Sequence, residues 1–367
     1  MRSSRFAAAV LAFSALFTMG LGPARLSDSD WPQRPLDRQQ ITALHETPFP
    51  ELTAAAVLAA NTTTGRILYA RNEHARRSPA SLTKIVTAIV AVERGDLNRK
   101  ITIKKEDLAV YSMIGMQVSD EYTLHDMIYF VLITSDNAAS LAIARTLGGG
   151  DPQVFVGWMN DKVAEWGLQN THFTNPHGFD DVGNYTSAYD MAVIALRAMQ
   201  YPWFAEIVGQ AQKDIANWRL RSTNQMLSTY PGAVGIKTGT EVLAGECLIT
   251  LVRRPEGEYL TVVLGSQDRY GDSKRLLDYY YSTLSELHVE LPESPQNRYR
   301  DAQGQWRAVG LREPRVYLVD RRLMGTELFF RQIDASRQSP SPDEPIGKLR
   351  ISLGGQPLDE APLYERR

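Results

Sequence analysis

Cysteine is almost absent from this 367-residue sequence, in which Cys247 is the single example, and neither acidic nor basic residues are in clear excess. One cysteine excludes an internal disulfide and a cysteine-rich zinc or iron–sulfur site. The six histidines never stand in a His-x-x-x-His spacing, so we expect no metal and no other cofactor. Lysine and arginine (40 residues) are balanced by aspartate and glutamate (42 residues), which argues against a nucleic-acid partner.

The N-terminal segment indicates export. Residues 1–5 include two arginines, residues 6–21 are uncharged and mostly apolar, and small residues follow to position 24. This order is typical of a secretory signal. The apolar run is short for a membrane span, which needs about 20 residues, but it could be retained as an anchor. We therefore expect residues 1–24 to be a signal peptide or anchor, and the protein to act in the periplasm or at the outer face of the cytoplasmic membrane.

The remaining chain is expected to form one large and one small domain. Hydrophobic residues make up 43% and charged residues 22%, as in an ordinary globular protein. Residues 25–52 are polar and contain several prolines, which predicts a linker. Residues 291–367 are rich in Pro, Arg and Gln and contain three short strand candidates, so we expect a small β-rich domain; the candidates are residues 315–319, 327–331 and 347–353.

Between these segments the pattern is mixed. A strand over residues 54–60, a turn at Gly65 and a returning strand to residue 69 are expected first. Ser78 and Pro79 then predict the N-cap and first position of a helix whose residues 81–93 are apolar almost all round, as in the middle of a core. Further helices are expected over 124–134 with Thr123 as cap, 138–147, 155–166, 187–199 and 272–287, and strands over 233–238, 246–253 and 259–265.

Three short patterns carry the candidate chemistry. They occur in the order Ser81-Leu82-Thr83-Lys84, Ser135-Asp136-Asn137 and Lys237-Thr238-Gly239. Each pattern alone is weak, but the first lies at a helix start, the second at a break between helices and the third at a strand end. Because long stretches of chain separate them, only a folded domain can bring them together.

The first pattern predicts an activated nucleophile. Ser81 lies near the start of its helix, where free N–H groups favour developing negative charge, and Lys84 follows one turn later on the same face. A serine hydroxyl needs a neighbouring base, and a lysine can be that base if burial and a second cation, Lys237, lower its pKa. The alternative is a capping serine beside a solvated lysine, which the apolar helix disfavours.

The other two patterns are open to structural interpretations when taken singly. The second could cap the helix that starts at residue 138, or Ser135 could pass a proton to the leaving amine while Asn137 binds the substrate amide. Lys237 and Thr238 could bind a carboxylate, or the third pattern could be a plain hairpin turn. With Gly239 allowing close approach of a substrate strand, the N–H groups of Ser81 and Thr240 would form an oxyanion hole.

Longer segments around these patterns resemble a known family. Residues 76–88 (Arg-Arg-Ser-Pro-Ala-Ser-Leu-Thr-Lys-Ile-Val-Thr-Ala), 167–178 (Gly-Leu-Gln-Asn-Thr-His-Phe-Thr-Asn-Pro-His-Gly) and 235–240 (Gly-Ile-Lys-Thr-Gly-Thr) are similar to segments of the D-alanyl-D-alanine carboxypeptidases, the low-molecular-weight penicillin-binding proteins of the S11 type. The similarity covers residues 53–290, and residues 345–353 resemble the small β domain that many members carry.

The resemblance implies a fold and a reaction. The fold is α/β (α+β), with a β-lactamase/D,D-peptidase-like catalytic domain over 53–290 in which helices flank an antiparallel sheet, and a small C-terminal β-rich domain. The reaction is removal of the terminal D-alanine from a peptidoglycan stem peptide through an acyl-serine, and β-lactams would acylate the same serine. By motif match Ser81 is the nucleophile and Lys84 the base, and the supporting and carboxylate-binding residues are Ser135, Asn137, Lys237 and Thr238.

Some features depart from the family pattern. Asp136 stands where many members have glycine, and Thr240 where a bulkier residue is common. Arg269 is a further candidate for carboxylate binding. The last ten residues show no amphipathic apolar face, so any membrane contact is expected only through the N-terminal segment.

Three other functions share part of this pattern. A D,D-endopeptidase of peptidoglycan cross-links would use the same acyl transfer. A class A β-lactamase would also need a glutamate after the middle motif, and Glu165 is placed only roughly for that role and is expected on the surface of a helix. A non-catalytic envelope scaffold would have no need of a buried lysine beside a serine.

Overall fold

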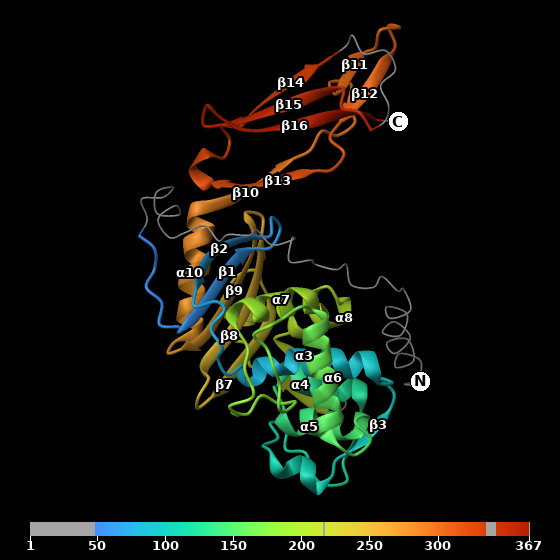
Figure 1. Cartoon of the computed structure of the whole chain (residues 1–367), viewed down its shortest axis with the longest axis vertical. Helices are drawn as coiled ribbons and strands as arrows, with labels where there is room; N and C mark the ends of the chain where they lie inside the picture. Colours follow the sequence, from blue (N-terminus) through green and yellow to red (C-terminus); the bar gives the residue numbers. More distant parts are fainter. Residues whose placement is uncertain (1–47, 216, 335–342, 367) are drawn as a thin grey trace. The chain divides into compact units, whose positions relative to one another are not determined.

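The computed structural model describes residues 48–215, 217–334 and 343–366 (Figure 1). Its described residues divide into two compact units, one with residues 49–278 and the other with Pro48 and residues 279–334 and 343–366. The predicted signal segment 1–24 and most of the predicted linker 25–52 lie outside the described residues. No helix within the described part of the chain has the length and apolar character needed to span a bilayer.

The first unit is built on a five-stranded antiparallel sheet in the order β2-β1-β9-β8-β7. Strands β1 (Ala56–Asn61) and β2 (Arg66–Arg71) come from the start of the unit, whereas β7 (Ala233–Glu241), β8 (Gly245–Arg254) and β9 (Gly257–Ser266) come from its end. Residues of β1, β8 and β9 are almost all buried, as expected for a sheet covered on both faces. The expected antiparallel sheet is thus confirmed, and β7 is an edge strand.

In sequence, the helices lie between the two groups of strands that form the sheet. Helix α3 (Lys84–Arg94) is buried from Lys84 to Val92 and contacts α4, α5, α6 and α7, which confirms the predicted core helix. The helices around it are α4 (Leu124–Ile133), α5 (Asn137–Leu147), α6 (Pro152–Glu165), α7 (Ala188–Met199), α8 (Pro202–Val208) and the short α9 (Met226–Thr229).

Capping side chains fix where several of these helices begin. Thr123 accepts a hydrogen bond from the Asp126 N–H, as predicted, and Asp136 accepts one from the Ala139 N–H at the start of α5. The predicted N-cap at Ser78 is wrong. The chain first forms a 3₁₀ turn, η2 (Ala80–Thr83), because Ala80 has a φ of 48° and interrupts the helical path, and the Ser78 hydroxyl instead donates to Asp180.

Two small ribbons complete the first unit and were not predicted. Strands β3 (Lys100–Thr102) and β4 (Glu121–Thr123) pair with each other, as do β5 (Gln212–Ile215) and β6 (Trp218–Arg221). The chain between β3 and β4 makes a long excursion that includes the 3₁₀ turn η3 (Lys105–Ala109).

The second unit is β-rich, as expected. Its five-stranded sheet has the order β11-β12-β16-β15-β14, and its own apolar core includes Val309, Leu349 and Leu363. The strands are β11 (Arg298–Arg300), β12 (Trp306–Gly310), β14 (Leu328–Ile333), β15 (Gly347–Leu353) and β16 (Gln356–Arg366), and the 3₁₀ turn η4 (Arg321–Leu323) precedes β14.

The predicted helix over 272–287 is only partly correct. Helix α10 covers Arg269–Thr283, and the chain then becomes strand β10 (Leu284–Val289). β10 pairs along its whole length with β13 (Arg315–Asp320), and this long-range pairing overrides the local helical pattern.

Candidate active site

Ser81, the predicted nucleophile, lies on the 3₁₀ turn η2 directly before the first residue of α3. The turn is held by close backbone packing. A Cβ added to Gly178 would lie 1.9 Å from the Ala80 carbonyl oxygen, and Gly178 also has a φ of 92°, so both space and conformation require glycine there. The loop carrying Gly178 therefore fixes the backbone on which Ser81 stands.

Lys84 is fully buried and its amine lies among three oxygen atoms. The Nζ atom is 2.8 Å from Ser81 Oγ, 2.7 Å from Asn137 Oδ1 and 2.5 Å from the His177 carbonyl oxygen. The contact with Asn137 joins the first motif to the second. The backbone contact with His177 adds a loop that contains none of the three motifs.

Burial lowers the pKa of Lys84 well below its usual value, and the positive charge of Lys237 lowers it further. The carboxylates of Asp136 and Glu241 oppose this shift, but burial is the largest cause. The neutral amine is therefore more accessible than in an ordinary exposed lysine. Because it lies within hydrogen-bonding distance of Ser81 Oγ, it can accept the proton of the hydroxyl.

Ser135 lies at the break between α4 and α5 with a φ of 62°, a left-handed conformation that is uncommon for serine. Its hydroxyl is 2.8 Å from Lys237 Nζ, which also reaches the Thr238 carbonyl oxygen at 3.1 Å. This contact joins the second motif to the third. Non-glycine residues with such backbone strain, of about 1–3 kcal/mol each, tend to persist where a functional geometry needs them.

Lys237 is also buried, and its environment differs from that of Lys84. Burial lowers the pKa of Lys237 to about 7. The positive charge of Arg269 contributes to this shift as a second, smaller cause. Near neutral pH this amine is thus divided between its charged and neutral forms. A bound carboxylate would favour the charged form and raise the pKa again.

The third motif brings the edge strand β7 against the nucleophile turn. A Cβ on Gly239 would lie 3.0 Å from the Ser81 nitrogen, so the strand passes very close to η2. The Thr238 hydroxyl is 2.7 Å from that of Thr223, and Thr240 is exposed. The oxyanion hole at the Ser81 and Thr240 N–H groups stays a prediction, and the approach of Gly239 to Ser81 supports it.

The Arg269 side chain contacts strand β7. Its guanidinium donates to the Gly239 carbonyl oxygen at 2.8 Å and lies 3.6 Å from a carboxylate oxygen of Glu246. It therefore braces the strand that carries the third motif and contributes positive charge near Lys237.

Sequence reasoning missed three contributors to this arrangement: the His177 carbonyl, Thr223 and the carboxylate of Asp136. Burial and the charge of Lys84 lower the pKa of His177 to about 3, so its ring is neutral and it acts here through its backbone. The Pro-His-Gly sequence at 176–178 was noted only as part of a resembling segment. Nothing in the local sequence around Thr223 indicates its contact.

Comparison with known proteins identifies a family that covers most of the first unit. The model of the S11 peptidase family, described as D-alanyl-D-alanine carboxypeptidase, matches residues 42–268, which is more than half of the chain. The chain belongs to this family.

Individual members of the carboxypeptidase family show how far the likeness extends. D-alanyl-D-alanine carboxypeptidase DacF of Bacillus subtilis is 33% identical over 235 residues, which cover 60% of this chain and 60% of that protein. DacD of Salmonella typhimurium is 30% identical over 297 residues, 75% of this chain and 72% of the relative. Penicillin-binding protein 5 from Haemophilus influenzae, a solved structure, is 25% identical with a TM-score of 0.66, and the match covers 88% of this chain and 98% of that one.

Family membership confirms the predicted fold class and the predicted enzyme class, a hydrolase of the D-Ala-D-Ala carboxypeptidase type. Glu165, considered above for a β-lactamase, is 63% exposed at the end of α6 and pairs with Lys162 at 3.0 Å. It is therefore a surface residue of the helix, as predicted. Within the described residues no group of three His, Cys, Asp or Glu side chains is arranged to hold a metal ion.

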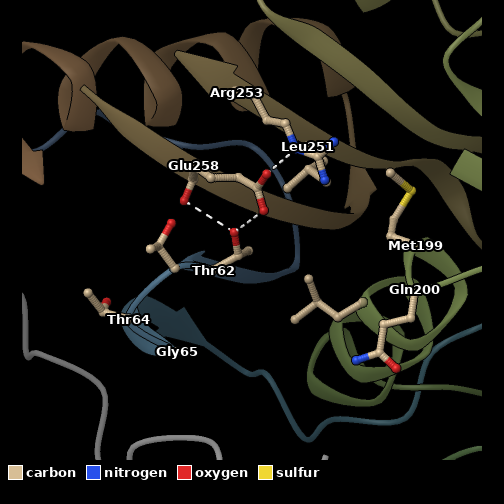
Figure 2. A pocket seen from close by; sticks show the side chains of 10 residues that line it. Thr62, Thr64, Gly65, Met199, Gln200, Leu251, Arg253 and Glu258 are labelled. Atoms are coloured by element: carbon tan, nitrogen blue, oxygen red, sulfur yellow. Dashed lines mark hydrogen bonds and ion pairs between the residues drawn. The ribbon is translucent and has the colours of Figure 1, made fainter. Parts of the chain in front are cut away.

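A separate hollow of about 390 Å³ lies at another part of the first unit (Figure 2). It is lined by the β1–β2 turn, the end of α7 and the β8–β9 hairpin, and none of its lining residues belongs to the three motifs. On one side Glu258 accepts hydrogen bonds from Thr62 and Arg253. The three motifs and this hollow are thus distinct features of the carboxypeptidase unit.

Proposed function

We propose that the chain is a serine-type D-Ala-D-Ala carboxypeptidase that releases the terminal D-alanine of a peptidoglycan pentapeptide through an acyl-Ser81 intermediate. The observation that carries the proposal is the buried Lys84 amine 2.8 Å from the Ser81 hydroxyl. An amine with a lowered pKa beside a serine is what a nucleophilic mechanism needs, and it would be costly to bury without a purpose.

The acylation step follows from these contacts. Lys84 takes the hydroxyl proton while Ser81 Oγ forms a bond to the carbonyl carbon of the penultimate D-alanine. The N–H groups of Ser81 and Thr240 stabilise the oxyanion. As the peptide bond breaks, Ser135, in contact with Lys237, passes a proton to the nitrogen of the leaving D-alanine. The proton that Lys84 took from Ser81 then restores the Ser135 hydroxyl, so that Lys84 is neutral again and Lys237 stays charged.

Deacylation restores the enzyme. Water adds to the acyl carbon and gives up a proton to a neighbouring amine, the bond to Ser81 Oγ breaks, and the serine oxygen recovers its proton. The products are the shortened peptide and free D-alanine. β-Lactams would enter the same path, because their ring carbonyl also acylates Ser81.

Lys237 and Thr238 would orient the substrate by its terminal carboxylate. The charged form of Lys237 supplies the countercharge, and the Thr238 hydroxyl, positioned by Thr223, supplies a hydrogen bond. Asn137, already in contact with Lys84, would bind the amide on the acyl side. We expect a protein with such a substrate to act outside the cytoplasm, in the periplasm or on the outer face of the membrane.

Mass spectrometry after incubation with a labelled penicillin tests the proposal. We expect one adduct, on Ser81, and release of D-alanine from a pentapeptide. Ser81→Ala should abolish both, whereas the matched control Ser228→Ala, at an exposed serine of α9, should leave both unchanged. An adduct on another residue, or D-alanine release by Ser81→Ala, would refute the assignment.

A cross-linked peptide dimer used as a second substrate distinguishes the endopeptidase. Preference for the dimer over the pentapeptide would assign the same site to cross-link hydrolysis instead.

A further inference from the structure

Asp136 is the residue of the middle motif for which the catalytic proposal has no use, although it is completely buried. Its carboxylate is saturated with hydrogen bonds. Oδ1 accepts from the Ala139 N–H at 2.8 Å as the cap of α5. Oδ2 accepts from the Ser112 hydroxyl at 2.8 Å, the Met113 N–H at 2.6 Å and the Ile114 N–H at 3.2 Å. One oxygen of this buried carboxylate, Oδ2, therefore binds a segment more than twenty residues earlier in the chain.

That segment belongs to the excursion of residues 103–120 between β3 and β4. A second buried carboxylate holds the other part of the excursion. Asp107 binds the Arg145 guanidinium through two contacts of 2.8 and 2.7 Å, and it also accepts from the Lys104 N–H. Because Arg145 and Asp136 both belong to the α5 region, the excursion is fastened to this region at two points.

The fastened segment presents apolar side chains to solvent. From residue 111 to 116 exposure alternates: Ser112, Ile114 and Met116 point inward, while Tyr111 is 67% and Met113 50% exposed. The Ser112 hydroxyl also accepts from the Met116 N–H at 3.1 Å, which stiffens the turn. Two large apolar side chains are thus displayed from a backbone that is fixed on both sides of them.

The position of this segment connects it to the site. The carboxylate that holds it lies between Ser135, in contact with Lys237, and Asn137, in contact with Lys84. In the mechanism proposed above, Asn137 binds the amide on the acyl side of the scissile bond. The segment is therefore hydrogen-bonded to the residue that stands between the two motif side chains in contact with the lysines.

We propose that Asp136 is a positioning residue that fixes residues 111–114 as an apolar wall of the active site, and that Tyr111 and Met113 on this wall bind the aliphatic part of the acyl-donor peptide. The ligand of the wall rests on the proposed function. A methionine adapts its shape to an aliphatic chain and a tyrosine offers a rigid apolar face, so together they suit a flexible alkyl group.

Hydrogen exchange tests the positioning role without any substrate. In Asp136→Ala no side-chain oxygen is left to accept, so exchange of the Met113 and Ile114 N–H groups should accelerate by about tenfold. Ser112→Ala, which leaves the carboxylate charge in place, should produce a smaller acceleration at the same groups. Unchanged exchange at Met113 and Ile114 in Asp136→Ala would overturn the positioning role.

A matched control comes from the same excursion. Asp120 accepts from the Gln117 N–H at 2.8 Å and from the Tyr122 hydroxyl at 3.1 Å, away from residues 111–114. Asp120→Ala should accelerate exchange at Gln117 and leave Met113 and Ile114 as they are. Equal acceleration of Met113 by both variants would show general loosening and contradict a specific contact.

Kinetics with two substrates test the wall. For a pentapeptide, the double variant Tyr111→Ala/Met113→Ala should raise KM by about tenfold with kcat within about twofold, because it removes binding that is equal in the ground and transition states. For acetyl-D-Ala-D-Ala, which lacks the aliphatic chain, KM should be unchanged. Asp136→Ala should raise KM for the pentapeptide more than KM for acetyl-D-Ala-D-Ala. Equal losses for both substrates, or no loss, would overturn the assignment of the wall.

The outcomes separate this inference from the proposed function. If the unaltered protein neither releases D-alanine nor is acylated by penicillin, the proposed function fails, and the ligand of the wall fails with it. Exchange at Met113 and Ile114 would still decide whether Asp136 holds the segment. If the unaltered protein is active and the double variant treats both substrates like the parent, the inference about the wall fails by itself.

Discussion

Lys84 and Lys237 are both buried beside a serine hydroxyl, yet the mechanism needs them in opposite protonation states. Lys84 must be neutral to accept a proton, and Lys237 must be charged to hold a carboxylate. The groups around Lys84 are Lys237, Asp136, Glu241 and the neutral His177, and burial dominates among the influences on it. For Lys237 burial and Arg269 lower the pKa to about 7.

The pH dependence of kcat/KM should therefore be bell-shaped. A lysine is charged below its pKa, so the carboxylate-binding form of Lys237 is lost as the pH rises through about 7. The neutral form of Lys84 is lost as the pH falls through its lowered pKa, which produces the acid limb. D-Alanine release from a pentapeptide, measured across the pH range at low substrate concentration, gives this profile.

Lys237→Arg identifies the origin of the alkaline limb. A guanidinium stays charged throughout the range, so the limb near pH 7 should disappear even if the maximum rate falls. The exposed lysine variant Lys105→Arg should keep the profile of the parent. An unchanged alkaline limb in Lys237→Arg would contradict the role of Lys237.

The residues of the three motifs could be predicted from sequence because spacing along a helix or strand decides which side chains share a face. That the three motifs lie next to one another in the folded chain could not be derived in this way. Lys84 depends on the His177 carbonyl, and Thr238 depends on Thr223, and these contacts exist only after distant loops have packed. The cap of α5 by Asp136 is local, and a cap in this motif was one of the interpretations considered from sequence, whereas the contact of Asp136 with Met113 is long-range and could not be predicted.

At the scale of elements, the nucleophile turn is held by the loop of Gly178 rather than by helix α3. The substitution Gly178→Ala would place a Cβ 1.9 Å from the Ala80 carbonyl oxygen, in a backbone conformation that alanine adopts poorly. Displacing a nucleophile by about 1 Å can cost about 100-fold in rate. We expect Gly178→Ala to slow acylation by penicillin by about that factor, measured by stopped-flow or quenched mass spectrometry.

Gly157 provides the control for this substitution. It lies on the exposed side of α6 with no atom near the added Cβ, so Gly157→Ala should stabilise the protein by about 0.5–1 kcal/mol and leave acylation unchanged. If Gly178→Ala acylated at the rate of the parent, the loop could not be what fixes η2.

Elements with a strong local pattern were predicted well, and those decided by pairing were not. The apolar surface of α3 and the Thr123 cap of α4 are properties of contiguous residues. By contrast, residues 284–289 continue the predicted helix in sequence but form β10, because β13 offers a complete antiparallel partner. The turn η2 replaced a helical start for a similar reason, since contact with Gly178 determines its backbone.

At the scale of the whole molecule, the two units have cores that share no residue. All residues of the three motifs belong to the first unit. Leu349→Ala, in the core of the second unit, should reduce the free energy of unfolding of that unit by about 2–5 kcal/mol. Scanning calorimetry should show one lowered transition, and acylation of Ser81 at 25 °C should match that of the parent.

Ile89→Ala is the corresponding variant in the core of the first unit, where Ile89 is fully buried on α3. It should lower the other transition and, on heating, reduce the fraction of protein that penicillin can acylate. Loss of acylation at 25 °C in Leu349→Ala would show that the units do not unfold separately.

The environment of the lone thiol has a practical consequence. Cys247 is completely buried in β8, and burial raises its pKa to about 11, so hardly any thiolate is present at neutral pH. Since the thiolate is the form that reacts with maleimides and similar reagents, the native chain should resist alkylation while folded. A cysteine introduced at Val182, which is 98% exposed, would then be a unique attachment point for a fluorescent or spin label without prior removal of Cys247.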